Sequence, residues 1–262
     1  MNDMDIPQTA IQDAQSATTH NSPPTGRSIL VTIATYNERE NLPELIRAIF
    51  DVEPSVEILV IDDNSPDGTG QLVDQMAAAD PRVHVLHRSG KLGLGTATIA
   101  ALRYAIENDY DYVLNMDADF SHHPRYIPAL LAGMNEHDVM LGSRYIPGGG
   151  VPDWPWKRKL MSRAVNFYAR WLLGLPVRDT SGAFRCFSVQ SLRRIDFDRI
   201  ISRGYSFQEE MLYWCNRAGC RFGETPIVFE DRRHGSSKIN RAEAFAAIGI
   251  IFWLGLKRIF GR

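Results

Sequence analysis

The stretch ILVTIATYNERENLPELIRAIFDVEPSVEILVID, residues 29–62, decides the fold class of this chain. It opens and closes with β-branched apolar runs, Ile29–Thr35 and Glu57–Ile61, and between them Asn41–Phe50 has apolar residues at helical spacing. Short apolar runs that alternate with helical segments of roughly 10–15 residues indicate βαβ units, whose strands pair in parallel. The stretch therefore predicts a strand, a covering helix and a second, parallel strand.

The same alternation continues as far as residue 141. Further strands are expected at Val83–Leu86, Tyr112–Met116 and Val139–Leu141, and further helices at Gln71–Ala79, Gly95–Asn108 and Arg125–Met134. Repeated βαβ units form a mostly parallel sheet with helices on both faces. We expect a Rossmann-like α/β fold, which binds its ligands outside the carboxyl ends of the strands.

Composition excludes several classes of protein. The 262 residues include 29 Lys+Arg and 31 Asp+Glu, so the formal net charge is -2 and no basic surface for wrapping nucleic acid is expected. The cysteines, Cys186, Cys215 and Cys220, are odd in number and lack metal-type spacing, which argues against a disulfide framework or a zinc site. We expect a cytoplasmic protein with no nucleic-acid partner.

Residues 1–26 differ in composition from the rest of the chain. They contain no Lys or Arg and no apolar block, whereas a signal peptide needs a basic start and an apolar core. Such a composition buries too little surface to offset chain entropy, so we expect a disordered tail. The chain is thus divided into a tail at 1–26, an α/β domain at 27–240 and an amphipathic or apolar helix at 241–262.

Polar residues follow three of the predicted strands. They are Thr35–Glu38, Asp62–Thr69 and the DADFSHHP run at 117–124. A single Asp in such a place is usually a helix cap or an Asx-turn. Three loops that carry carboxylates at one sheet edge, one of them with an Asp-x-Asp pair, favour Mg²⁺ or Mn²⁺ and substrate phosphates. No G-x-G-x-x-G follows the first strand and no Walker loop occurs, so a nicotinamide oxidoreductase is not indicated.

These motifs resemble the family 2 glycosyltransferases of the GT-A fold, and most closely the dolichol-phosphate (polyprenol-phosphate) mannosyltransferases. The similar segments occur in order at 34–42, 62–69, 117–124, 142–145, 179–185 and 229–238. One departure is Ala34, where the resembling enzymes usually have Pro. The run at 117–124 and the late Arg-x-x-Gly-x-Ser-Lys run, which starts at Arg232, are the most specific parts of the resemblance.

The resemblance implies a GT-A glycosyltransferase domain at 27–240. The implied reaction is inverting transfer of mannose from GDP-mannose to a polyprenyl phosphate, which gives a β-linked mannosyl phosphate lipid. Two alternatives stay open: a related transferase with another nucleotide sugar (glucose or N-acetylglucosamine) or another acceptor, and a non-catalytic nucleotide-sugar binding module. The joint presence of Asp117, Asp119, Arg232 and Lys238 argues against the binding module.

The resemblance also implies roles for individual residues. The guanine and ribose are expected against Ala34, Tyr36, Glu38, Ile61 and Asp63. The diphosphate and a Mg²⁺ or Mn²⁺ ion are expected at Asp117, Ala118, Asp119 and Ser121, with Asp117, Asp119 and Ser121 as metal ligands. For His122 and His123 we expect a role in shaping the loop through bonds to backbone carbonyls, because an oxygen-rich site favours a hard cation.

Four cations are implied for the phosphates of donor and acceptor: Arg144, Arg158, Arg232 and Lys238. Arg and Lys both bind phosphate, Arg through a fork of N–H donors. Asp119, Arg144 and Arg232 are the implied catalytic residues, with Glu210 in a positioning role. No strong base is required, because a phosphate acceptor is already anionic at pH 7.

Two segments suggest contact with a membrane surface. On a helical wheel, Trp154–Gly174 separates an apolar stripe from a basic side, as in helices that lie at lipid interfaces. Ala244–Leu256 is uncharged, precedes Lys257 and Arg258, and is shorter than the roughly 20 residues of a spanning helix. We expect peripheral attachment to the cytoplasmic face of a membrane. The alternatives are burial of these stripes in the core and, for the second segment, a contact between copies in a homo-oligomer.

Overall fold

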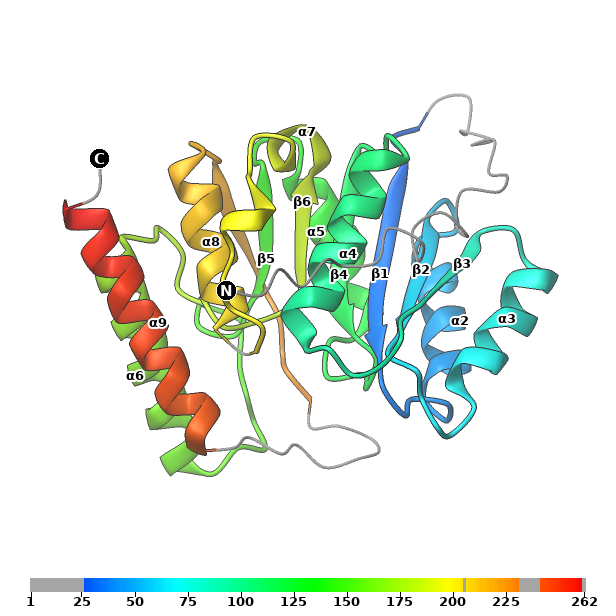
Figure 1. Ribbon diagram of the computed structural model, residues 1–262, viewed down its shortest axis with the longest axis horizontal. Helices are drawn as coiled ribbons and strands as arrows, with labels where there is room; N and C mark the ends of the chain where they lie inside the picture. The colour runs from blue at the N-terminus through cyan, green and yellow to red at the C-terminus, as the bar shows by residue number, and fades with distance from the viewer. Residues whose placement is uncertain (1–25, 205, 231–240, 261–262) are drawn as a thin grey trace, which may run out of the picture.

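The computed structural model describes residues 26–204, 206–230 and 241–260. Within them lies a seven-stranded sheet of order β3-β2-β1-β4-β6-β5-β7 (Figure 1). The strands are β1 Ile29–Thr35, β2 Glu57–Asp62, β3 Val83–His87, β4 Tyr112–Asp117, β5 Val139–Ser143, β6 Arg185–Ser188 and β7 Phe222–Pro226. Only β6 runs antiparallel to its neighbours β4 and β5, so the predicted mostly parallel sheet is confirmed.

The apolar strands are buried on both faces of the sheet. In β2, Ile58 and Val60 belong to one core cluster, while Leu59 and Ile61 belong to the other. Successive side chains of a strand point to opposite faces, so a continuous apolar run requires a covering layer on each side. The sheet is therefore the middle of three layers.

The covering helices divide between the two faces. Their bounds are α2 Leu42–Val52, α3 Thr69–Ala79, α4 Leu94–Glu107, α5 Ile127–Gly133, α6 Trp156–Leu173, α7 Val189–Leu192, α8 Phe207–Arg217 and α9 Arg241–Phe260. Helices α2, α3 and α5 bury side chains in one cluster, and α4, α6, α7, α8 and α9 in the other. The predicted helix 125–134 is instead divided into a 3-10 turn, Pro124–Tyr126, and the helix α5, which has proline in its first turn. Proline has no backbone N–H to donate to the preceding turn, so a single continuous α-helix does not form here.

Helices α6 and α9 pack against each other at the end of the molecule away from α3 (Figure 1). Arg258 of α9 donates from Nη1 to the carbonyls of Trp171 and Leu172, at 3.3 and 3.1 Å, and so caps the last turn of α6. A cation at this helix end also complements the helix dipole. Among the described residues, no helix is both long and apolar enough to span a bilayer.

Candidate active site

Three strand ends lie side by side at one edge of the sheet. Ala34 of β1 is in register with Ile61 of β2 on one side and with Asp117 of β4 on the other. Because these strands run in parallel, the loops that follow them meet at the same carboxyl edge. The sheet thus brings together the three polar loops that were expected at one edge.

Each of these loops contains a residue in the left-handed region of φ. Asn37 has φ 63°, Asn64 has φ 56° and Phe120 has φ 62°. Asn adopts this conformation at little cost, but an aromatic residue rarely does so. Backbone strain of this kind gathers at ligand sites, where surrounding packing holds it in place.

The two aspartates that follow β2 have different surroundings. Asp62 holds its own loop: its carboxylate accepts from the Ser65 hydroxyl at 2.5 Å and from the Ser65 amide at 3.1 Å. Asp63 forms a nearly buried ion pair with Arg88, 2.9 Å between Oδ1 and Nη1. Burial raises the pKa of Asp63 above its usual value, although Arg88 opposes the shift. Asp63 and Arg88 therefore form a dipolar pair beside the carboxyl edge of β2.

The other residues expected near the nucleotide differ in their exposure and in their contacts. Tyr36 is exposed, and Lys91 Nζ lies 4.5 Å from its ring centroid. Glu38 accepts from Asn41 Nδ2 at 2.7 Å. The expected contact between the Ile61 side chain and the base is corrected by the structure. This side chain is 1% exposed and packs in the hydrophobic core, so it offers no surface to a base.

The Asp-x-Asp loop after β4 is held by its own side chains. Asp119 is almost fully buried, and its Oδ1 accepts from the amide and hydroxyl of Ser121 at 3.0 and 2.5 Å. Asp117 is more exposed and lies with Oδ2 3.6 Å from Nδ1 of His122. Two carboxylates and one hydroxyl are hard oxygen donors, the kind that Mg²⁺ and Mn²⁺ take.

His122 is a core side chain beneath this loop. Its ring stacks on Phe184 at 5.2 Å and meets Phe229 edge-on at 5.6 Å. Nδ1 accepts from the backbone amide of Asp117 at 3.3 Å, and burial lowers the pKa of the imidazole. His123 Nδ1 likewise accepts from a backbone amide, that of Arg125. Both histidines thus shape the loop by accepting from backbone amides.

Arg144 follows β5 and forms a buried, bidentate ion pair with Asp179. Its Nε and Nη2 donate to the two carboxylate oxygens at 2.7 and 2.6 Å, and its Nη2 also donates to Ser181 Oγ at 2.8 Å. Burial favours the neutral form of Asp179, but the guanidinium outweighs it and lowers the pKa of the carboxyl. The pair fixes a guanidinium plane at the sheet edge.

A cavity of about 340 Å³ opens beside Arg144. Its lining includes Arg144, Lys159 and Arg163, and none of the described residues that line it is acidic. Arg158 lies nearby, with its guanidinium carbon 3.7 Å from the ring centroid of Trp154. A concave surface with several cations and no carboxylate suits a phosphate or another compact anion.

Comparison with known proteins identifies the family. Residues 30–198 match the family model "Glycosyl transferase family 2". This chain belongs to that family. An undecaprenyl-phosphate mannosyltransferase of Micrococcus luteus is 45% identical over 212 residues, 81% of this chain and 87% of the relative. A polyprenol monophosphomannose synthase of Mycolicibacterium smegmatis is 43% identical over 219 residues, 83% and 82% of the two chains.

Solved structures support the fold of this family 2 glycosyltransferase. Glucosyl-3-phosphoglycerate synthase of Mycobacterium tuberculosis, in complex with Mn²⁺, UDP and glucosyl-3-phosphoglycerate, matches with a TM-score of 0.62. The match covers 89% of this chain and 80% of that chain, at 21% sequence identity. The predicted GT-A architecture is confirmed, and at this identity the likeness concerns the fold alone.

Glu210 has a structural role in this glycosyltransferase. It is fully buried, and its carboxylate accepts from the amides of Ile201 and Ser202, at 2.8 Å for Ser202, and from Trp214 Nε1 at 3.3 Å. The segment that it holds meets the first turn of α4, where the Gly95 amide donates to the Arg203 carbonyl. We therefore assign Glu210 to the support of this loop and not to the reacting groups.

Several polar residues of the site were not placed in it from sequence. They are Arg88, Lys159, Arg163 and Asp179. Asp179 stands in a segment that carries the family resemblance, which was the signal for its importance. Arg232 and Lys238 lie outside the described residues.

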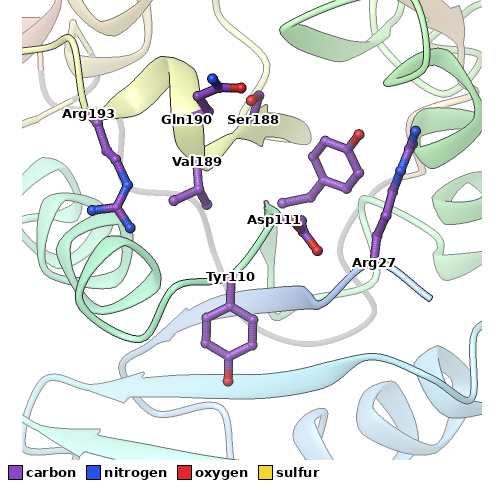
Figure 2. Close-up of a pocket in the computed structure, with 8 residues that line it drawn as sticks. Arg27, Tyr110, Asp111, Ser188, Val189, Gln190 and Arg193 are labelled. Atoms are coloured by element: carbon purple, nitrogen blue, oxygen red, sulfur yellow. The ribbon is translucent and has the colours of Figure 1, made fainter. Parts of the chain in front are cut away.

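A second cavity, of about 220 Å³, lies at the opposite, amino-terminal edge of the strands (Figure 2). Its charged groups already have partners: Asp111 accepts from the Ser28 amide at 2.7 Å, and Arg193 donates to Asp109 at 2.5 Å. Arg27 lies over the ring of Tyr112. This cavity is therefore separate from the candidate active site.

Proposed function

We propose that this enzyme transfers mannose from GDP-mannose to a polyprenyl phosphate. The observation that carries the proposal is the cation-lined cavity beside Arg144, which adjoins a helix with exposed apolar side chains. Relatives at 43–45% identity are named for mannosyl transfer to polyprenyl phosphates. A phosphate that carries a hydrocarbon chain matches both halves of this surface.

The donor is proposed to bind along the carboxyl edge of β1, β2 and β4. Tyr36 offers an aromatic wall to the base, and the Asp63–Arg88 pair offers one acceptor and one donor group to its polar edge. Ala34, Glu38 and the backbone of Ala118 line the path towards the diphosphate. Arg232 and Lys238, which lie outside the described residues, are proposed to close on the phosphates.

A divalent cation, Mg²⁺ or Mn²⁺, is proposed at Asp117, Asp119 and Ser121. The donor set fits a hard cation, because all three side chains offer oxygen. No group of three His, Cys, Asp or Glu side chains within the described ranges forms a complete metal cage. The nucleotide diphosphate would therefore supply the remaining ligands, as is common for Mg²⁺. When bound, the ion would stabilise the charge of the departing diphosphate.

The proposed chemistry is a single displacement at the anomeric carbon. An oxygen of the acceptor phosphate attacks that carbon as the bond to the GDP oxygen breaks, which inverts the configuration and yields a β-mannosyl phosphate. Arg144, held by Asp179, and Arg158 orient the acceptor phosphate and offset the repulsion between two anions. The acceptor is ionised at pH 7, so no side chain has to remove a proton.

The acceptor chain is proposed to stay in the membrane while the protein rests on its cytoplasmic surface. The exposed apolar side chains of α6 are Trp156, Leu160, Met161, Phe167 and Trp171, and those of α9 include Phe252, Trp253, Ile259 and Phe260. Because α6 and α9 pack together, both sets belong to one end of the molecule (Figure 1). Basic residues of α6, such as Lys157 and Arg163, would meet anionic headgroups.

One assay tests the proposed function. Purified protein is incubated with Mn²⁺ or Mg²⁺, a polyprenyl phosphate and a panel of GDP- and UDP-sugars, and the lipid product is identified by mass and linkage. We expect a β-mannosyl phosphate lipid from GDP-mannose. A product from UDP-glucose or UDP-N-acetylglucosamine alone would replace the sugar in the proposal. No lipid product from any donor would overturn it.

A further inference from the structure

Trp154 and Phe229 form an aromatic bridge between the Asp-x-Asp loop and the cation-lined cavity. The two rings meet edge-on at 5.5 Å, and Phe229 meets the ring of His122 at 5.6 Å. The guanidinium carbon of Arg158 lies over the Trp154 ring, 3.7 Å from its centroid. A continuous line of rings thus joins the loop proposed for the donor to a cation proposed for the acceptor.

The same rings also surround Arg144. Its guanidinium carbon lies 5.6 Å from the ring centroid of Phe229, 5.7 Å from that of Trp154 and 5.4 Å from that of Tyr145. Cations within about 6 Å of a ring centroid are attracted by the ring quadrupole. Trp154 therefore approaches both Arg144 and Arg158.

Trp154 is buried although it neighbours an exposed segment. It is 8% exposed, whereas Trp156, two residues later, is 69% exposed. Among the described residues, the indole Nε1–H of Trp154 has no hydrogen-bond acceptor. The fold thus uses the ring surface of this residue, and a ring of similar shape should preserve its contacts.

We propose that Trp154 is a positioning residue for the acceptor phosphate, and that its ring, backed by Phe229, holds Arg158 beside Arg144. This inference rests on the proposed function. A long, exposed Arg side chain samples many rotamers, so a ring that stacks on it lowers the entropy lost when it binds phosphate. The acceptor then meets two guanidinium groups in a fixed arrangement.

The test uses a short, water-soluble prenyl phosphate as acceptor, so that membrane attachment does not enter the measurement. Trp154→Leu should raise the KM for this acceptor by about two- to fivefold, the scale of a cation–π contact to an exposed cation. Its kcat and its Kd for GDP with Mn²⁺ should stay within about twofold of the original enzyme. Trp154→Phe, which keeps a ring, should recover most of the loss.

Two further variants separate this role from others. In an Arg158→Ala background, Trp154→Leu should add little to the KM, because the cation that it positions is gone. Trp156→Leu is the matched control: it should weaken binding to vesicles and leave the KM for the short acceptor unchanged.

The outcomes distinguish the inference from the proposed function. An unchanged KM in Trp154→Leu, or the same increase with and without Arg158, would overturn the inference while transfer by the original enzyme stands. If Trp154→Leu does not fold, the KM for the short acceptor is compared for Trp154→Phe with Arg158 present and with Arg158→Ala. We expect a smaller increase in the KM, which should appear only when Arg158 is present. Failure of the original enzyme to transfer sugar to any prenyl phosphate would overturn the proposed function, and the inference with it.

Discussion

Arg144 and Asp179 are 35 residues apart in the sequence and joined by three hydrogen bonds in the structure. The Asp179 carboxylate accepts from the Arg144 backbone amide at 2.9 Å and from its Nε and Nη2 at 2.7 and 2.6 Å. It also accepts from the Gly182 amide at 3.1 Å, so it organises the loop that carries it. A single carboxylate thus orients the cation, anchors the strand end and shapes its own loop.

Asp179→Asn should cost both stability and activity. It leaves the Arg144 guanidinium buried without a counter-charge, and removal of one partner of a buried pair typically costs about 3–5 kcal/mol. We expect a large fall in the free energy of unfolding, measured by denaturant titration, and a rise in the KM for the acceptor. Asp198→Asn is the control, because Asp198 pairs with Arg103 at the surface and its loss should change stability far less. Equal effects of the two substitutions would contradict the role given to Asp179.

Asp119→Asn should nearly abolish turnover without unfolding the protein. The amide oxygen can still accept from Ser121, but the charge that the metal and diphosphate require is gone. Loss of one such electrostatic contact costs about 10²–10³ in rate. The measurements are kcat with varied Mn²⁺ and a thermal unfolding curve, with the exposed Asp74→Asn as control. Near-normal turnover with unchanged metal dependence would remove Asp119 from the site.

Glu209 should make stability fall as pH rises through the weakly acidic range. Burial raises its pKa from 4.5 to about 7, against the opposing effects of a backbone hydrogen bond and Arg185. Between these values the unfolded chain loses a proton that the folded chain keeps, so the folded state loses stability with rising pH. A shift of this size corresponds to about 3 kcal/mol.

Glu209→Gln should remove this loss. The variant should gain stability over the original protein at pH 8 and gain little at pH 4, as measured by urea titrations at a series of pH values. Glu107→Gln, on an exposed side chain, is the control and should follow the original protein throughout. A pH-independent difference between Glu209→Gln and the original protein would show that the carboxyl has the same pKa in the folded and unfolded chains.

Binding to vesicles should have a salt-sensitive part and a salt-resistant part. A variant that combines Lys157→Gln, Lys159→Gln and Arg163→Gln should co-sediment less with anionic vesicles and equally well with neutral ones. The attraction between these basic residues and anionic lipid is absent at a neutral surface, and added salt screens it over a Debye length of about 8–10 Å. Phe167→Ser with Trp171→Ser should reduce the salt-resistant part, since both side chains are about 70% exposed.

Point substitutions are preferable here to deletion of α9. Ile251 and Leu254 of that helix are buried in the hydrophobic core, so its removal would expose the core as well as any membrane contact. The membrane proposal fails if the original protein stays in the supernatant with both kinds of vesicle at low salt. The exposed stripes would then be contacts with another protein or a second copy.

Most of the sheet was predictable because its signals are local. The run Ile29–Thr35 consists mostly of apolar and β-branched residues, and the structure has a strand with those bounds. The loops after β1, β2 and β4 were also predictable, because the carboxyl ends of parallel strands share an edge whatever the details of packing. Sequence alone therefore determined the fold class and the edge at which the Asp-x-Asp loop lies.

Tertiary structure decided the rest. The amphipathic pattern of α6 is the same whether its apolar stripe meets the core or the solvent, and only packing shows that Asn166 faces inward while Trp171 faces outward. Glu209 and Glu210 are adjacent and alike in sequence. The Glu210 carboxylate nevertheless accepts from two backbone amides, whereas Glu209 retains a buried Oε2 with no hydrogen-bond partner among the described residues. Arg144 found its partner 35 residues away. Periodicity reports which side chains share a face, but the residues that cover that face come from distant parts of the chain, so only the packed structure specifies them.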